Sequence, residues 1–362
     1  MKKTVLFRLL VLSAAALVLL SSCGTGKAVM TYKGAKITEN EFRFYLATYK
    51  ARFAQTYSDF KDNAAFYRQS MGDGTAEDFL FSAVVQNVGY SLVSDELFRE
   101  YGLSLPASVT ADVDGYVDSY LTDLAEGSKT VLNRYLGAYG VNMKLFREIL
   151  LRDERSSAVY AYLYGEDGKI GLNDDDRQTY LENNYARVRH IYVNNAYVYA
   201  TDDEGKPVYG TDGHQEKTPL TGDALDAKNA LVAAIDEALA SGEDFDTVYE
   251  TASEDKYYKE GYYLTRDMNF IKGVVRSAFE LEIGEWTKVE SDVGVHYIMR
   301  IPLGEKPWAD ESCADFFPDY DETVSSALFT DMLEGLRGEI GYDEEILSRY
   351  TVEASPMNTR FQ

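Results

Sequence analysis

The stretch GEWTKVESDVGVHYIMRI, residues 284–301, predicts the fold of the second half of this chain. Its two glycines predict turns, and the β-branched and aromatic residues that follow each glycine predict strands. A shorter run upstream, RVRHIYV at residues 187–193, has the same composition. The chain contains three histidines, and two of them, His190 and His296, occupy matched positions within these runs. The rest of the chain can be described by what precedes, joins or follows the two strands.

The segment between the two strands predicts a small α/β domain. Residues 194–223 are rich in Gly, Asp, Thr and Asn, which is typical of a long loop or an extended hairpin, and we expect His214 to be solvated there. The patterns that follow indicate a helix, a second helix, a short loop or strand and a third helix, at residues 225–240, 245–255, 261–264 and 274–281. The order strand, helix, helix, short element, helix, strand, strand describes one α/β domain, which we place at residues 183–303.

The part before this domain is predicted to be almost entirely helical. Residues 29–37 indicate a strand-turn-strand element, and Thr38 with Glu41 forms a capping-box pattern that begins the first helix. Further helices are predicted at residues 75–101, 109–124, 130–139, 142–164 and 173–183. The many tyrosines and phenylalanines of these helices are more typical of core and groove lining than of a cofactor site.

Residues 322–337 carry an apolar stripe of Val324, Leu328, Met332 and Leu336 on one helical face. A helix of this length is marginal alone in water, so its stripe must pack against something. We expect residues 304–362 to pack on the N-terminal helices. The predicted fold class is therefore α+β: a helical N-terminal domain, residues 23–182, completed by the C-terminal segment, with the α/β domain inserted between the two.

The first 22 residues predict a secretory signal. A basic start, with Lys2, Lys3 and Arg8, precedes an apolar run at residues 9–20 that is too short for a comfortable membrane span. The sequence Leu20-Ser21-Ser22-Cys23-Gly24 then resembles the lipobox of bacterial lipoproteins, in which Cys23 would be lipidated. The alternative is an ordinary signal peptide followed by a chance cysteine. We expect an extracytoplasmic protein that is anchored to the cell membrane by lipid and does not span it.

Composition argues against several classes of function. The formal net charge is −24, and removing residues 1–22 makes it more negative, which argues against nucleic acid or anionic lipid as a general partner. No phosphate-binding glycine loop, Cys-Cys metal spacing or His-Glu helix motif is present, so we expect neither a cofactor nor a metal. Lipidation of Cys23 would leave Cys313 alone, which excludes an intramolecular disulfide.

The order of elements, together with the residues at seven points, resembles the parvulin class of peptidyl-prolyl cis/trans isomerases. The matching pieces are Arg189-His190-Ile191, Gly242-Glu-Asp-Phe245, Ser253-Glu-Asp255, Gly261-Tyr-Tyr263 with Met268, Ala278-Phe279-Glu-Leu281, Gly284-Glu285 and Gly294-Val-His296-Tyr-Ile298. The lipobox and the helical N-terminal part further resemble PrsA-type foldase lipoproteins and their SurA-like relatives.

This resemblance implies a set of site residues. His190 and His296 would be the paired histidines, Asp255 would take the position of a cysteine or aspartate, and Ser291 would supply a hydroxyl. The apolar residues that would bind the proline ring are Met268 and Phe279, with Phe270 or Val274 in place of an expected phenylalanine, and with Tyr263. Alternatively, the two histidines are a structural pair that only holds the strands together.

Three departures from the family pattern bear on activity. Glu260 stands where the family has leucine, the phenylalanine expected four residues after Met268 is missing, and the proline expected before Val289 is absent. Asp202, Asp203 and Glu204 replace the basic loop of phosphate-directed parvulins, which argues against a phosphorylated substrate.

The resemblance implies a lipid-anchored foldase that isomerises X-Pro bonds in unfolded or partly folded secreted polypeptides. The alternative is a chaperone whose isomerase domain is degenerate and weakly active or inactive, which the departures at Glu260 and after Met268 favour. A generic solute-binding lipoprotein would require alternating βαβ units across two lobes, and the helical N-terminal part argues against it. The sequence leaves open whether the protein forms a homodimer.

Overall fold

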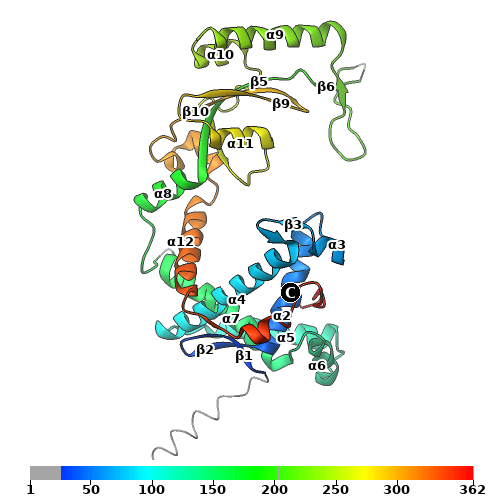
Figure 1. Ribbon diagram of the computed structural model, residues 1–362, viewed down its shortest axis with the longest axis vertical. Helices are drawn as coiled ribbons and strands as arrows, with labels where there is room; N and C mark the ends of the chain where they lie inside the picture. The colour runs from blue at the N-terminus through cyan, green and yellow to red at the C-terminus, as the bar shows by residue number, and fades with distance from the viewer. Residues whose placement is uncertain (1–25, 166, 203, 362) are drawn as a thin grey trace, which may run out of the picture. The chain divides into compact units, whose positions relative to one another are not determined.

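The computed structural model describes residues 26–165, 167–202 and 204–361 (Figure 1). The chain forms two compact units. One consists of Met1–Gly171 with Ser325–Gln362 and is called the helical unit, and the other consists of Leu172–Val324 and is called the α/β unit. The predicted α+β fold class is confirmed, because a small α/β body is inserted into a helical body that the end of the chain completes.

The helical unit contains a small antiparallel sheet built from both ends of the chain. Strand β1 (Ala28–Tyr32) pairs with β2 (Ala35–Thr38) on one side and with β11 (Gly341–Tyr342) on the other. In the second pairing Met30 lies opposite Tyr342, and Thr31 lies opposite Gly341. The C-terminal segment therefore contributes a strand to the fold as well as a helix.

Helices make up the rest of this unit, together with a short hairpin of β3 (Ser70–Met71) and β4 (Gly74–Thr75). The helices are α2 (Glu39–Thr56), α3 (Ala64–Tyr67), α4 (Ala76–Glu100), α5 (Ala107–Asp123), α6 (Lys129–Gly137), α7 (Met143–Tyr164), α12 (Tyr320–Arg337) and α13 (Glu344–Leu347). The capping box at Thr38 and Glu41 is present, and Thr75 with Asp78 forms another at the start of α4. The boundary between the two units falls within α12.

The core of the helical unit is rich in aromatic side chains and is closed by the end of the chain. Phe361 is 1% exposed, and its ring lies 5.6 Å from the ring of Phe146 and 5.0 Å from that of Tyr120. Asn358 is fully buried and donates a hydrogen bond from its side chain to Thr48 Oγ1 at 2.9 Å. The last residues described are therefore part of the core.

The α/β unit is organised around a four-stranded antiparallel sheet with the order β8-β5-β10-β9. Its strands are β5 (Tyr185–Val193), β8 (Tyr262–Thr265), β9 (Trp286–Ser291) and β10 (Gly294–Ile301). Its helices are α8 (Asp174–Asn184), α9 (Gly222–Ala240), α10 (Phe245–Ala252) and α11 (Lys272–Glu280). A hairpin of β6 (Tyr197–Tyr199) and β7 (Lys217–Pro219) carries the polar loop, where His214 is exposed.

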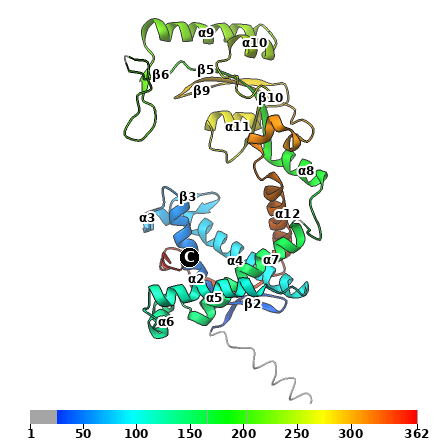
Figure 2. The same cartoon turned by 180° about the vertical axis from the view of Figure 1, so that it is seen from behind.

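The two faces of this sheet are covered by different helices, which lie on opposite sides of it in Figures 1 and 2. Ile191, Val193 and Tyr297 form a cluster with residues of α9 and α10. Ala186, Val188 and Ile298 form another with residues of α11. Because side chains alternate along a strand, His190 lies on the α11 face with Val188.

The α/β unit extends beyond the predicted residues 183–303. Residues 304–324 belong to it rather than to the helical unit, and they include the 3₁₀ turns Pro307–Ala309 and Glu311–Phe316. Phe317 lies 5.3 Å from the ring of Tyr185 and 5.0 Å from that of Tyr263. The expectation that the whole of residues 304–362 packs on the N-terminal helices is wrong for its first part, because these aromatic side chains bury against the sheet.

Candidate active site

The two histidines of the strand pair lie side by side on the α11 face of the sheet. In the antiparallel register His296 pairs with Tyr192 and His190 pairs with Ile298, so the two imidazoles are diagonal neighbours. Their rings are inclined by only 12°, and His190 Nε2 lies 3.0 Å from His296 Nδ1. His190 is 5% exposed and His296 is 2% exposed. The structure thus brings together the two histidines that the sequence singled out.

Asp255 closes one end of this pair. Its Oδ2 lies 3.2 Å from His190 Nδ1 and also accepts a hydrogen bond from the hydroxyl of Tyr262, while its Oδ1 accepts from the Tyr257 amide at 3.1 Å. Burial raises the pKa of Asp255, but the hydrogen bonds from His190, Tyr262 and the Tyr257 amide outweigh burial and lower it to about 2. Asp255 is therefore an ionised carboxylate at neutral pH.

The loop that carries Asp255 is tied to β5 through Ser253. The Tyr192 amide donates to Ser253 Oγ at 3.2 Å, and Ser253 Oγ donates to the carbonyl oxygen of Asp255 at 2.8 Å. The Glu254 amide donates to the carbonyl oxygen of Tyr192 at 2.8 Å. These bonds fix the carboxylate relative to the strand that carries His190.

Ser291 closes the other end, at the hairpin between β9 and β10. Its Oγ lies 2.9 Å from His296 Nε2 and accepts a hydrogen bond from the Val293 amide at 3.2 Å. Ser291 lies opposite Gly294 in the register of the hairpin. The site is therefore a continuous line of hydrogen bonds from Asp255 through His190 and His296 to Ser291, in which the two histidines are buried and the two ends are partly exposed.

The charge on Asp255 sets the direction of the protons along this line. A carboxylate only accepts hydrogen bonds, so the Nδ1–H of His190 donates to it, and a ring with a single N–H then has Nε2 as its acceptor. The Nδ1–H of His296 then donates to His190 Nε2, which leaves His296 Nε2 to accept from the hydroxyl of Ser291. One carboxylate thus selects the tautomer of both imidazoles.

Burial also keeps His296 neutral. Desolvation, and next the charge on a protonated His190, lower the pKa of His296 to about 4, although Asp255 opposes this shift. The imidazole of His296 therefore carries no charge at neutral pH, which is the state that the hydrogen-bonded line requires.

These shifts predict an acid-sensitive α/β unit. The folded pKa of His296, about 4, lies below its ordinary value of about 6.5, so its contribution to stability is present above pH 6.5 and is lost as pH falls toward 4. The difference corresponds to at most about 3 kcal/mol of unfolding free energy. The contribution of Asp255 is present above about pH 3.9 and is lost toward pH 2.

Urea unfolding of the full chain at a series of pH values, followed by NMR signals of the α/β unit, measures this loss of stability. A His296→Asn variant should flatten the curve between pH 6.5 and 4, and a flat curve in the unchanged chain would contradict the assignment.

Aromatic side chains surround the histidine pair. The ring of Tyr262 meets that of His190 edge-on at 5.3 Å, and Phe270 lies 6.4 Å from His190. Tyr192 stacks on His296 at 5.0 Å. Two residues are candidates for the position of the missing phenylalanine. Phe270 adjoins the histidine pair, whereas Val274, on α11, is 1% exposed in the core between that helix and the sheet. Met268 and Phe279 pack against the same core and line an adjoining pocket.

Glu260, in the loop before β8, and Tyr263, within β8, lie elsewhere than the sequence suggested. Tyr263 pairs with Arg187 on the opposite face of the sheet, and its hydroxyl donates to the carbonyl oxygen of Leu303 at 2.5 Å, so it does not adjoin the histidines. The neighbouring Tyr262 does, and strand alternation from Val188, its partner in the register, could have identified it. The carboxylate of Glu260 is 66% exposed and lies 3.8 Å from the guanidinium of Arg187, so it does not border the site.

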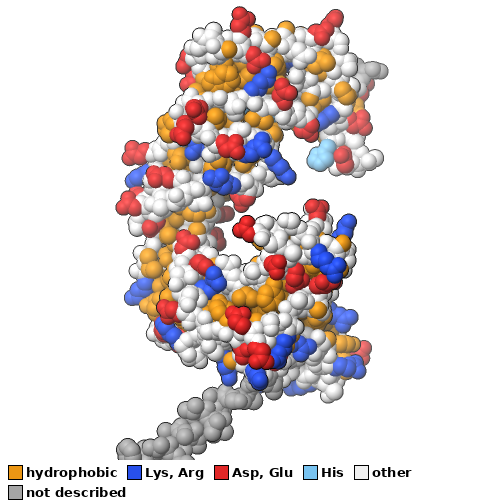
Figure 3. Space-filling view, in the orientation of Figure 1, with side chains coloured by type: hydrophobic (Ala, Val, Ile, Leu, Met, Phe, Trp, Pro, Cys, Tyr) orange, Lys and Arg blue, Asp and Glu red, His pale blue; other side chains and the backbone are white. Residues whose placement is uncertain are grey.

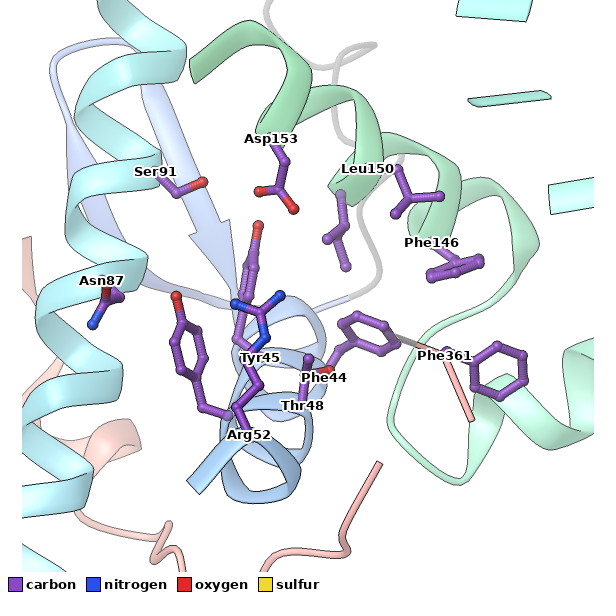
Figure 4. A pocket seen from close by; sticks show the side chains of 12 residues that line it. Phe44, Tyr45, Thr48, Arg52, Asn87, Ser91, Phe146, Leu150, Asp153 and Phe361 are labelled. Atoms are coloured by element: carbon purple, nitrogen blue, oxygen red, sulfur yellow. The ribbon is translucent and has the colours of Figure 1, made fainter. Parts of the chain in front are cut away.

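The helical unit has a cavity of its own, of about 140 Å³ (Figure 4). Phe44, Phe146 and Phe361 form its apolar wall, and Tyr45 and Asp153 are among its polar residues. The hydroxyl of Tyr45 points toward Asp153. Burial raises the pKa of Tyr45 to about 12. The sequence predicted that such aromatic residues line core or groove, and it did not single out these polar ones.

The remaining features concern metal ligands, membrane-spanning helices and the two cysteines. Within the described residues, no group of His, Cys, Asp and Glu has the arrangement of a metal site, and no helix is long and apolar enough to span a membrane. Cys313 is buried and free. The signal sequence and Cys23 lie outside the described residues.

Comparison with known proteins gives structural neighbours only. No family model matches the chain, and no curated protein matches it. Among solved structures, the chain is similar to PrsA from Bacillus subtilis, with 14% identity over 80% of this chain and 90% of that chain and a TM-score of 0.24. The peptidylprolyl isomerase PrsA from Bacillus cereus shows 16% identity over 90% and 91%, with a TM-score of 0.27. NmPin, the parvulin of Nitrosopumilus maritimus, shows 23% identity over 33% of this chain and 97% of that chain, with a TM-score of 0.20.

Proposed function

We propose that this protein is a peptidyl-prolyl cis/trans isomerase of the parvulin type that assists the folding of secreted polypeptides. The observation that carries the proposal is the line of hydrogen bonds from Asp255 through the buried His190 and His296 to Ser291. The residues that form it are those that the resemblance in sequence implied, and they come from separate parts of the chain. Phe270 and Tyr262 border this line and supply an apolar surface for a proline ring.

The chemistry requires little of the protein. Rotation about the X-Pro bond breaks the amide resonance, with a barrier of ~18–20 kcal/mol, and needs no covalent step. The site accelerates rotation only if it binds the twisted amide more tightly than either planar form. A twisted amide has less charge separation than a planar one, so an apolar surface around the bond favours it. The uncharged imidazole of His296 adds no charge beside this surface.

The main alternative is a chaperone whose isomerase domain is degenerate. One feature that favoured it was Glu260, because a carboxylate at the rim of an apolar pocket keeps the pocket wet. The exposed position of Glu260 beside Arg187 weakens this objection. The second feature was the missing phenylalanine after Met268, and Phe270 lies against His190 where an aromatic ring is needed. Both observations favour an active site.

The proposal is tested by measuring isomerisation of an X-Pro peptide with the full chain, by NMR exchange between the cis and trans signals. We expect the exchange rate to rise in proportion to the protein concentration. Asp255→Asn should reduce kcat/KM by about tenfold to a hundredfold, because an amide can donate to His190 and no longer fixes its tautomer. Lys256→Ala, a change at the next residue, is the matched control and should keep full activity. No acceleration by the unchanged, folded chain would refute the isomerase function and leave the chaperone alternative.

We also propose that Cys23 is lipidated and anchors the protein outside the cytoplasm. The support is the sequence alone: the basic start, the apolar run and the small residues before Cys23. Incorporation of a labelled fatty acid into the expressed chain tests it. A Cys23→Ala variant should lose the label, and label retained in this variant would contradict the assignment.

A further inference from the structure

A pocket of about 400 Å³ lies between α11 and the turn that precedes it. Its apolar part is formed by Met268 and Phe279, and its rim carries Arg266, Lys272 and Arg276. Figure 3 shows Lys and Arg side chains gathered in this region of the α/β unit. Such a concentration of positive charge is unusual in a chain with a net charge of −24.

In the part of the chain that the structure describes, the three cations have no carboxylate partner. None of the ion pairs formed within the described part of the α/β unit includes Arg266, Lys272 or Arg276. The other arginines of this unit mostly have one: Arg177 pairs with Asp321, for example, and Arg189 pairs with Asp246. The cations of the pocket therefore remain available to an external anion.

Two guanidinium groups also meet around one ring in this region. Arg266 lies 4.1 Å from the centre of the Phe279 ring and Arg300 lies 5.9 Å from it. Arg300 donates to the carbonyl oxygen of Ala278 at 2.8 Å, which holds it in place. Burial, and next the charge of Arg266, lower the pKa of Arg300. The two cations repel each other, and an anion bound beside them would relieve that repulsion.

The one acidic residue that lines the pocket does not neutralise it. Among the described residues Asp267 forms no ion pair with the three cations. Its charge acts on Tyr180, whose pKa is raised first by burial and next by Asp267, and on Tyr185, whose pKa is raised first by burial, next by Tyr180 and then by Asp267. The pocket thus keeps a net positive charge.

Met268 connects this pocket with the candidate active site. Its carbonyl oxygen accepts a hydrogen bond from the Phe270 amide at 2.9 Å, and Phe270 lies against His190. Met268, Phe270 and Phe279 pack against one and the same core cluster. A peptide whose proline lies on Phe270 would therefore pass near the cationic rim.

We propose that this pocket binds an acidic side chain of the polypeptide whose proline is isomerised, so that the protein prefers X-Pro segments with Asp or Glu close to the proline. This inference rests on the proposed isomerase function and adds the class of substrate. The apolar wall of Met268 and Phe279 accommodates the methylene groups of a glutamate, and the three cations bind its carboxylate.

The test uses the full chain and a series of peptides with a single proline. Glu, Gln or Lys is placed in turn at each position that flanks the proline, and kcat/KM is measured for every peptide. At one position at least, we expect Glu to exceed Gln by about threefold to tenfold and Lys to fall below Gln, as for partly exposed ion pairs. This preference should shrink as salt rises from about 0.05 to 0.5 M, because exposed charges are screened.

Reversing the charge of residues at the pocket tests whether the preference for Glu arises there. The double variant Lys272→Glu/Arg276→Glu should prefer Lys over Glu at the same position, whereas Lys206→Glu/Lys217→Glu, the same charge change in the β6–β7 hairpin, should keep the preference for Glu. Equal rates for Glu and Gln at every position would overturn the inference, as would the same reversal in both double variants.

A failure of this inference can be distinguished from a failure of the proposed isomerase function. If no peptide is isomerised, the proposed function is refuted, and NMR titration with the Glu and Gln peptides then tests the pocket directly. Tighter binding of the Glu peptide, with shifts at Met268 and Phe279, would still support an acidic-peptide site. Equal binding of both peptides would refute it.

Discussion

Replacing His296 with alanine is expected to abolish most of the proposed isomerase activity and to destabilise the α/β unit. His296 is 2% exposed, and its ring joins His190 to Ser291. Alanine would leave a cavity and remove a hydrogen-bond partner from both neighbours. Large-to-small substitutions in a core and unpaired buried polar groups each cost about 1–4 kcal/mol, so we expect a loss of about 2–4 kcal/mol of unfolding free energy. We expect kcat/KM to fall by at least about tenfold.

The matched control is His214→Ala. His214 is exposed in the β6–β7 hairpin, so the same change there should alter neither property. A third variant, His296→Asn, separates the catalytic interpretation from the purely structural one, because asparagine can still donate to His190 and occupies most of the space. Restored stability without restored activity would support a role for the imidazole in the reaction. Full activity in His296→Ala, measured at a temperature where the unit is folded, would show that the pair only holds the strands together.

Removing the end of the chain is expected to lower the thermal stability of the helical unit strongly. A chain that ends at residue 338 would lack β11, α13 and Phe361, and would expose the core around Phe146. Loss of one buried phenylalanine costs about 3–5 kcal/mol, and the truncation adds the loss of the strand pairing with β1. We expect the melting temperature of this unit to fall by more than about 10 °C.

Thermal unfolding followed by NMR signals assigned to each unit measures this effect. The signals of the α/β unit should keep their melting temperature, because its core clusters contain no residue after Val324. Phe361→Ala is the finer variant, and Phe79→Ala, on a ring that is 43% exposed, is its matched control. An unchanged melting temperature in both the truncated chain and Phe361→Ala would contradict the completion of the helical unit by its tail.

The two central strands could be predicted from the sequence because their signals are local. β5 and β10 are runs of β-branched and aromatic residues bounded by turn residues, and two of the three histidines fall within them. The partners of those histidines required the resemblance to a family. Asp255 lies 65 positions from His190, and Ser291, although only five positions from His296, carries no pattern of its own. It was harder to predict from the sequence which side chains of a strand lie on the same face of the sheet. A shift of one residue reverses the side of a strand, and this is why Tyr263 was expected at the site that Tyr262 occupies.

The extra segments of both units could not be predicted from periodicity. Residues 304–324 include two 3₁₀ turns, which have no amphipathic repeat to detect, and this segment is held by aromatic contacts such as that of Phe317 with Tyr263. β11 is two residues long, and Phe361 makes its contacts with rings that are remote in sequence. These features depend on a completed core, which a local pattern does not report.

The pairing of β1 with β11 sets the order in which the chain can acquire its structure. Thr31 and Gly341 are joined by a hydrogen bond across 310 positions of the sequence. A chain synthesised from its N-terminus therefore presents β1 and the core around Phe146 long before their partners exist. The α/β unit, which is contiguous from Leu172 to Val324, can finish within that interval. A protein proposed to assist the folding of others thus keeps its own helical body unfinished until synthesis ends, and during that time this body is itself an incompletely folded chain.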